Sequence, residues 1–170
     1  MKTKKFILSL LFLLSVATLS GCLGYKIGST PPAGVKKIYI PMFENRTTRQ
    51  EITSDVTNGI VRRFRTDGTV KITDKEYADA ILYGTITEYK REVVSYTNQD
   101  IGKEFRITIY VDIVLKDAKT GKVILKSTGI DGQAVTSLNI NQSESEKMIM
   151  PDIIRDLSKN VVEAVLESQW

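Results

Sequence analysis

The strongest constraint on the fold is a plain alternation of apolar with mostly polar residues over residues 105–115. Successive side chains of a β-strand point to opposite faces, so this period of two predicts one long strand. One face of the strand is expected to meet a core and the other to meet water, as in an antiparallel sheet covered on one side. The apolar positions are Phe105, Ile107, Ile109, Val111, Ile113 and Leu115.

Four further segments complete the predicted sheet. They combine β-branched and aromatic residues with turn residues at their ends, which is typical of strands. Two glycines, Gly129 and Gly132, interrupt the last segment. A glycine inside a strand indicates a bulge or a bend, and we expect one there. The predicted strands are residues 36–43, 69–73, 80–97 and 122–136.

Two other segments repeat an apolar residue at every fourth position, which predicts amphipathic helices. Residues 48–51 and 143–146 each fit a capping box, the motif that begins many helices. Pro151 lies within the second segment, where a proline kinks a helix or marks its start. The apolar stripes are Ile52, Val56, Ile60 and Phe64 in the first helix and Ile149, Ile153, Leu157 and Val161 in the second.

The order of these elements, β-α-β-β-β-(β)-α, predicts an α+β fold. We expect a mixed, mostly antiparallel sheet of four to five strands, with both amphipathic helices packed on one face. The strands on either side of the first helix are expected to run parallel, because a crossover connection joins them. A single domain over residues 35–170 accounts for all of these elements.

The N-terminal residues predict where the chain resides. Lys2, Lys4 and Lys5 precede an uncharged apolar run over residues 6–19. As a helix this run is about 21 Å long, which is too short for a hydrocarbon core of roughly 30 Å. A basic start followed by a short apolar run is typical of a secretory signal peptide. We therefore expect residues 1–21 to be a cleaved lipoprotein signal peptide.

The end of this segment, Leu19-Ser20-Gly21-Cys22, resembles the lipobox of bacterial lipoproteins. In such proteins the Cys thiol receives a diacylglycerol, the chain is cut before the Cys, and the new amine is acylated, typically with palmitate. Cys22 is the only cysteine of the chain. Two or more acyl chains anchor a protein stably to a membrane. The alternative is an ordinary signal peptide that happens to end near a thiol.

The resemblance to lipoproteins also implies a location. Leu23 follows the cysteine, whereas an Asp there usually retains a Gram-negative lipoprotein in the inner membrane. This implies a lipid-anchored protein of the outer membrane, on the periplasmic face. Residues 22–34 then form the lipidated N-terminus and a tether rich in Gly and Pro.

The residue counts exclude several kinds of chemistry. The chain has no His and one Cys, which rules out His-based triads, His-ligated metals and Cys-rich clusters. It also lacks the glycine-rich motifs that bind phosphates. We therefore predict no catalytic residue, no metal site, no cofactor and no enzymatic activity. The formal charge falls from +4 to +1 once the three signal-peptide lysines leave, so nucleic-acid binding is not predicted either.

The non-core face of the long strands is the candidate binding surface. Tyr and Arg are enriched in protein interfaces, and Arg or Lys pairs with lipid phosphates. The alternative is an ordinary hydrated sheet face. The residues expected to share this surface are Tyr83, Tyr89, Arg91, Arg106 and Tyr110, with Lys90 at its border.

Four short stretches occur in a characteristic order along the chain. They are Gly24-Tyr25, IYIPMFENRT over residues 38–47, ADAILYGTI over residues 78–86 and LKDAKTGK over residues 115–122. Their order, together with the helices that flank the sheet, resembles the LptE family of lipopolysaccharide-assembly lipoproteins. The resemblance extends from Cys22 to about Leu166.

This resemblance implies a function without covalent chemistry. LptE-like proteins plug the LptD β-barrel of the outer membrane and support its assembly. They bind lipopolysaccharide through basic residues for insertion into the outer leaflet. No short motif carries the family's lipid contacts to this sequence. Position and charge alone make Lys90, Arg91 and Arg106 the candidates for lipopolysaccharide binding.

Two other functions remain open at this point. The segment IPMFENRT also occurs near the start of lipoprotein adaptors that regulate periplasmic enzymes, such as those that build peptidoglycan. The chain could instead carry a small apolar ligand, which requires a cavity between the sheet and the helices.

Overall fold

The structure is a computed structural model that describes residues 34–96, 102–137 and 142–167. The predicted signal peptide, lipobox, Cys22 and most of the tether lie outside these residues. The elements are β1 (Lys37–Tyr39), β2 (Glu44–Asn45), α2 (Ile52–Asp67), β3 (Lys71–Ile72), the 3-10 helix η2 (Lys75–Tyr77), β4 (Ala80–Tyr96), β5 (Gly102–Asp117), β6 (Val123–Ser137) and α3 (Gln142–Leu166).

The strands form one mixed sheet in the order β3-β1-β4-β5-β6, and β2 pairs with β4 outside this path. β1 runs parallel to β3 and β4, whereas β4, β5 and β6 are antiparallel neighbours. The α+β class and the parallel strands around the first helix are thus confirmed. The sheet has six strands, more than predicted, because the strand expected over residues 36–43 ends at Tyr39 and a further short strand, β2, follows beyond it. Pro41 cannot donate a ladder hydrogen bond, and the chain leaves the sheet near it before returning as β2.

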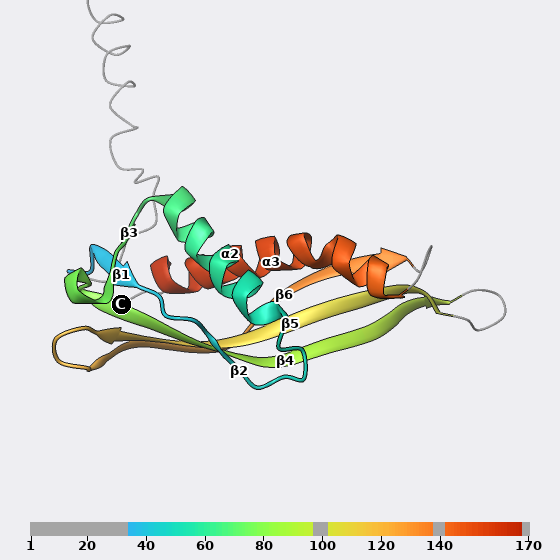
Figure 1. Cartoon of the computed structure of the whole chain (residues 1–170), viewed down its shortest axis with the longest axis horizontal. Helices are drawn as coiled ribbons and strands as arrows, with labels where there is room; N and C mark the ends of the chain where they lie inside the picture. Colours follow the sequence, from blue (N-terminus) through green and yellow to red (C-terminus); the bar gives the residue numbers. More distant parts are fainter. Residues whose placement is uncertain (1–33, 97–101, 138–141, 168–170) are drawn as a thin grey trace, which may run out of the picture.

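Both helices cover the same face of the sheet, as predicted (Figure 1). α3 lies along β6 and β5, and α2 crosses over α3. The alternating residues of β5 fill the centre of the core, where five of the six are fully buried and Phe105 is 9% exposed. The apolar stripes of the two helices cover them, with Ile60, Phe64, Leu157 and Val161 fully buried.

Two glycines allow the layers to approach closely. A Cβ atom on Gly132 of β6 would lie 2.4 Å from the backbone nitrogen of Leu157 in α3. A Cβ atom on Gly59 of α2 would lie 2.2 Å from Cγ2 of Ile154, also in α3. The other predicted irregularity of β6 is present as well. Gly129 adopts a φ of 68°, and the β5–β6 register shifts beside it.

The helix ends differ from the predicted capping boxes. Glu51 occupies the N-cap position of α2 and its side chain makes no capping bond. The loop before α2 is instead held by Asn45, whose amide donates to the carbonyl of Arg49 and to Oγ1 of Thr53. α3 begins at Gln142, before the expected cap, and Pro151 lies inside it.

The close approach at Gly132 predicts the effect of a single methyl group. Gly132→Ala forces α3 away from the sheet, because the atoms in its way are backbone atoms of Leu157. We expect a loss of about 2 kcal/mol in the free energy of unfolding, as is typical of overpacking. Chemical denaturation followed by circular dichroism measures this loss. The neighbouring exposed change Gln133→Ala is the control and should stay within about 0.5 kcal/mol. Equal stability of the two variants would contradict the packing described.

Candidate interaction surfaces

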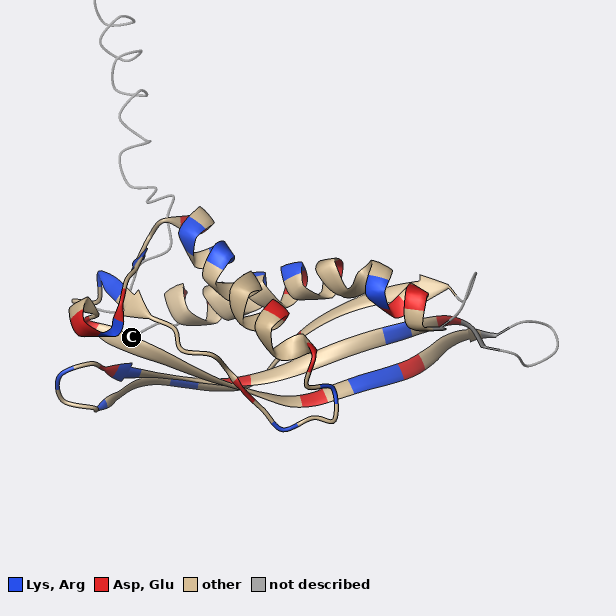
Figure 2. Ribbon diagram, in the orientation of Figure 1, with Lys and Arg blue, Asp and Glu red and all other residues tan. Residues whose placement is uncertain are grey.

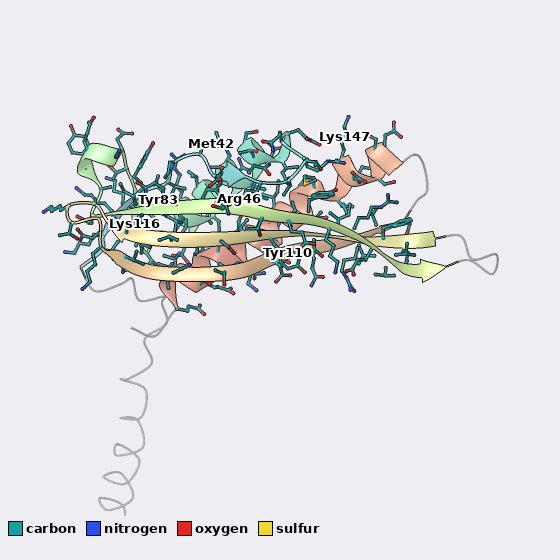
Figure 3. The ribbon with its side chains drawn as sticks, turned by 90° about the horizontal axis from the view of Figure 1, so that it is seen from below. Met42, Arg46, Tyr83, Tyr110, Lys116 and Lys147 are labelled. Carbon is teal, nitrogen blue, oxygen red and sulfur yellow. The ribbon has the colours of Figure 1, made fainter. Side chains whose placement is uncertain are left out.

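The face of the sheet opposite the helices is exposed and carries aromatic and charged side chains (Figure 3). The register places Tyr83 beside Val114, Glu88 beside Tyr110 and Glu92 beside Arg106 on this outward face. Tyr83 is 42% exposed, and the ammonium group of Lys116 lies 5.4 Å from the centre of its ring. The surface therefore offers aromatic rings and polar groups together.

The β2 segment adds further side chains to the outward face. Arg46 Nε lies 3.0 Å from Glu44 Oε1, and the hydrogen bond from Arg46 lowers the pKa of Glu44. Figure 3 shows Arg46 and Met42 together with Tyr83 and Tyr110 in the view from below. Met42 is 61% exposed. Sequence patterns could not indicate this contribution, because a two-residue strand has no measurable periodicity.

The structure corrects the predicted position of two residues. Tyr89 and Arg91 were expected on the outward face with Tyr83. The β4–β5 register shifts between Ile86 and Glu88, and this bulge turns the next residues of β4 over. Tyr89 and Arg91 consequently point to the helix side, beside Ile109 and Ile107.

The three candidate lipopolysaccharide-binding residues therefore lie on two different faces of the sheet. Lys90 and Arg106 are exposed on the outward face, where Lys90 Nζ lies 2.9 Å from Glu92 Oε1. This hydrogen bond raises the pKa of Lys90. Arg91 instead places its guanidinium 4.0 Å from the centre of the Phe105 ring, as a cation–π contact that covers the edge of the core.

A polar cluster joins the loop before α2 to β4 and α3 on the helix side. The carboxylate of Glu146, 7% exposed, accepts a hydrogen bond of 2.9 Å from Arg49 Nη2 and one of 3.3 Å from the Tyr89 hydroxyl. Arg49 also lies 2.7 Å from Glu51 and stacks over the Tyr89 ring at 4.9 Å. Arg49 and Glu146 both lie in segments that were predicted to be capping boxes. In the structure they form a long-range ion pair with each other instead.

The cluster changes the proton affinity of its members. Burial raises the pKa of Tyr89 to about 12, and the negative charge of Glu146 acts in the same direction. Burial alone would lower the pKa of Arg49, but Tyr89 and Glu146 outweigh it, so the pKa of Arg49 is raised. The arrangement combines the two ion pairs of Arg49 with the hydrogen bond from the Tyr89 hydroxyl.

A groove of about 570 Å³ lies beside this cluster, between the N-terminal parts of α2 and α3. Ile52, Met150, Pro151 and Ile154 form its apolar part, and charged residues including Lys147 surround them. Its volume suits a small amphiphilic molecule. The groove lies between the helices, whereas a carrier function called for a cavity between the sheet and the helices.

Two further findings concern membranes and metals. Within residues 34–96, 102–137 and 142–167, no helix is both long and apolar enough to cross a bilayer. The same part of the chain holds no group of three or more potential metal ligands of the His, Cys, Asp and Glu types.

Comparison with known proteins relates the chain to one family. The LptE family model, described as lipopolysaccharide-assembly, matches residues 35–165. Comparison with curated proteins gives no match.

Solved structures of bacterial lipoproteins share the fold at low sequence identity. Lipoprotein B from Nitrosomonas europaea is 16% identical with a TM-score of 0.58, over 85% of this chain and 91% of that one. Rare lipoprotein B from Shewanella oneidensis is 12% identical with a TM-score of 0.52, and the match covers 78% of this chain and 96% of that one. A minor lipoprotein from Acinetobacter baumannii is 15% identical with a TM-score of 0.53, and the match covers 78% of this chain and 92% of that one.

The raised pKa of Tyr89 predicts a pH dependence of stability. An unfolded Tyr loses its proton near pH 10, whereas Tyr89 in the folded chain does so at about 12. The stability that Tyr89 contributes is therefore complete below pH 10 and is lost as the pH rises to 12. Urea midpoints measured between pH 9 and 12 should fall less steeply in Tyr89→Phe than in the unaltered chain. Tyr77→Phe, at a 65% exposed site, is the control, and identical slopes in all three chains would refute the assignment.

Proposed function

The chain belongs to the LptE lipopolysaccharide-assembly family, and from this premise we propose that it plugs an LptD-type β-barrel of the outer membrane. In this proposal Cys22 is acylated and anchors the protein to the periplasmic face of that membrane. The protein supports assembly of the barrel and binds lipopolysaccharide for insertion into the outer leaflet. The family match carries the proposal, because it covers residues 35–165, almost the whole described domain.

The outward face of the sheet is the surface that we propose for the barrel. The interior of an outer-membrane barrel is polar, and a plug must offer it polar and aromatic groups. Tyr83 and Tyr110 can contribute apolar ring area while their hydroxyls remain able to hydrogen-bond. The ion pairs of Arg46 with Glu44 and of Lys90 with Glu92 keep this face close to neutral.

Lys90 and Arg106 are the residues that we propose for lipopolysaccharide. Both are exposed, and cationic side chains pair well with phosphate groups. Arg91 is a weaker candidate than its sequence position indicated, because its guanidinium already lies against Phe105. The proposed role is non-covalent and uses no cofactor.

The proposed plug predicts recovery of a barrel. Affinity purification of the full-length lipoprotein from outer membranes in mild detergent should recover a large β-barrel at near-equal amounts. Tyr110→Ala should lower this recovery about tenfold, since interface tyrosines are frequent hot spots. Ser54→Ala, on the exposed side of α2, is the control. Recovery of a periplasmic enzyme in place of a barrel would favour the adaptor hypothesis instead.

The assignment of the lipid contacts predicts a second result. The double variant Lys90→Glu, Arg106→Glu should bind purified lipopolysaccharide about tenfold more weakly, with a smaller dependence on salt, because two phosphate contacts are reversed. Arg91→Gln is the matched control and should affect stability more than binding. Titration of the detergent-solubilised lipoprotein with labelled lipopolysaccharide, at low and at high salt, measures the affinity and its salt dependence. Unchanged affinity of the double variant would remove these residues from the site.

A further inference from the structure

The charges of the domain are divided unevenly along its long axis (Figure 2). We call the proximal end the one formed by residues 34–39, 61–79, 114–126 and 161–167, where the described chain begins (Figure 1). It holds eleven Lys and Arg against seven Asp and Glu, a net charge of +4. The rest of the described chain holds nine against twelve, a net charge of −3. The domain is thus an electric dipole with its positive pole at the proximal end.

The two parts also differ in how their cations are paired. Every ion pair among the described residues uses Arg46, Arg49, Lys90, Arg155 or Lys159, and none of these belongs to the proximal end. The proximal cations therefore have no carboxylate partner within the described residues.

Three of the seven acids of the proximal end accept hydrogen bonds from backbone N–H groups. Asp79 accepts hydrogen bonds from the backbone N–H groups of Lys36 and Lys37. Asp117 accepts from the backbone of Lys119 and Thr120, and Asp67 accepts from that of Thr69. These three carboxylates are held in turns and do not form ion pairs with the neighbouring Lys and Arg side chains.

Six exposed cations at the proximal end, three on or beside the strands β1 and β3 and three on α2, are together called the basic patch. Lys37 of β1 stands opposite Lys71 of β3 in the parallel register, and like charges so placed repel each other. The dipole of α2 favours Arg65 in its last turn, but it does not account for lysines on two strands. An anion bound at this end would relieve the repulsion. The patch consists of Lys36, Lys37, Arg62, Arg63, Arg65 and Lys71.

The chain itself brings a membrane to this patch. Residues 23–33 connect Cys22 to Gly34, where the proximal end begins. Eleven residues reach at most about 40 Å when fully extended. An acyl anchor on Cys22 therefore holds the proximal end, and not the far end of β4 and β5, close to the lipid headgroups.

We propose that the basic patch docks on the phosphates of anionic phospholipids in the leaflet that holds the acyl chains of Cys22. The inference rests on the proposed function for the acylation only. Arg62, Arg63 and Arg65 lie on α2, whereas Lys37 and Lys71 continue the outward face of the sheet at the proximal end. The proposed contact orients the long axis of the domain away from the leaflet. Cationic segments next to a membrane bind anionic lipids in this way, and salt weakens the contact.

A fluorescent label near the patch tests this orientation. The full-length acylated lipoprotein is labelled at Thr66→Cys, an exposed site beside the patch, because Cys22 no longer carries a free thiol. It is reconstituted in vesicles of phosphatidylethanolamine and phosphatidylglycerol at 7:3, with a trace of headgroup spin-labelled lipid as quencher. Quenching should be at least threefold greater than in phosphatidylcholine vesicles, and 0.5 M NaCl should abolish the difference.

Charge reversal distinguishes an effect of the basic patch from an effect of the net charge of the protein. Arg62→Glu, Arg63→Glu, Arg65→Glu should bring quenching down to the level in phosphatidylcholine. Lys147→Glu, Arg155→Glu, Lys159→Glu makes the same change of net charge elsewhere and should leave quenching high. Unfolding midpoints of both triple variants show that the fold survives. Equal quenching in the two kinds of vesicle, or equal loss in the two triple variants, would overturn the proposal.

The same vesicles distinguish this inference from the proposed function. If Cys22 is not acylated, mass spectrometry shows it, and salt-sensitive binding of that chain to anionic vesicles still supports the patch. An acylated chain that co-purifies with its barrel but shows no salt-sensitive quenching at residue 66 refutes the patch and leaves the proposed function standing.

Discussion

The rest of the structure depends on burial of one face of β5. This strand lies between β4 and β6, and its alternating apolar residues lie under α3, which itself presents Ile153, Leu157 and Val161. Each fully buried side chain of this kind contributes roughly 1.5–3 kcal/mol. Burying one face requires α3 to lie close to β6, which explains why a glycine occupies position 132. The opposite face then remains in water and is available for contacts.

Features that depend on residues close together in the sequence could be predicted, whereas features that depend on distant residues could not. The β5 alternation and the helical stripes are local patterns, and they predicted the elements, the class and the covered face. The face of Tyr89 and Arg91 was predicted wrongly, since a bulge before Glu88 inverts the pleat without changing the local composition. The ion pair of Arg49 with Glu146 joins residues 97 positions apart, so no local pattern could indicate it.

The polar cluster shows how that long-range pair fixes the arrangement of the helices. Glu146 is buried, and a buried carboxylate without partners would cost several kcal/mol. The observed placement of α3 brings this carboxylate to both Arg49 and Tyr89. Apolar burial is non-directional, whereas hydrogen bonds require a defined geometry. The cluster therefore adds a directional constraint to the packing of α3, beside the groove between the helices.

The outward face and the proximal end differ in net charge, because their carboxylates have different partners. On the strands, Glu44 and Glu92 are free to pair with neighbouring cations, so the outward face is polar with little net charge. At the proximal end the turns need acceptors for backbone N–H groups, and Asp79 and Asp117 supply them. The lysines and arginines there form no ion pair among the described residues. A nearly neutral surface suits a polar protein wall, whereas unpaired cations beside a tether suit the phosphates of a membrane.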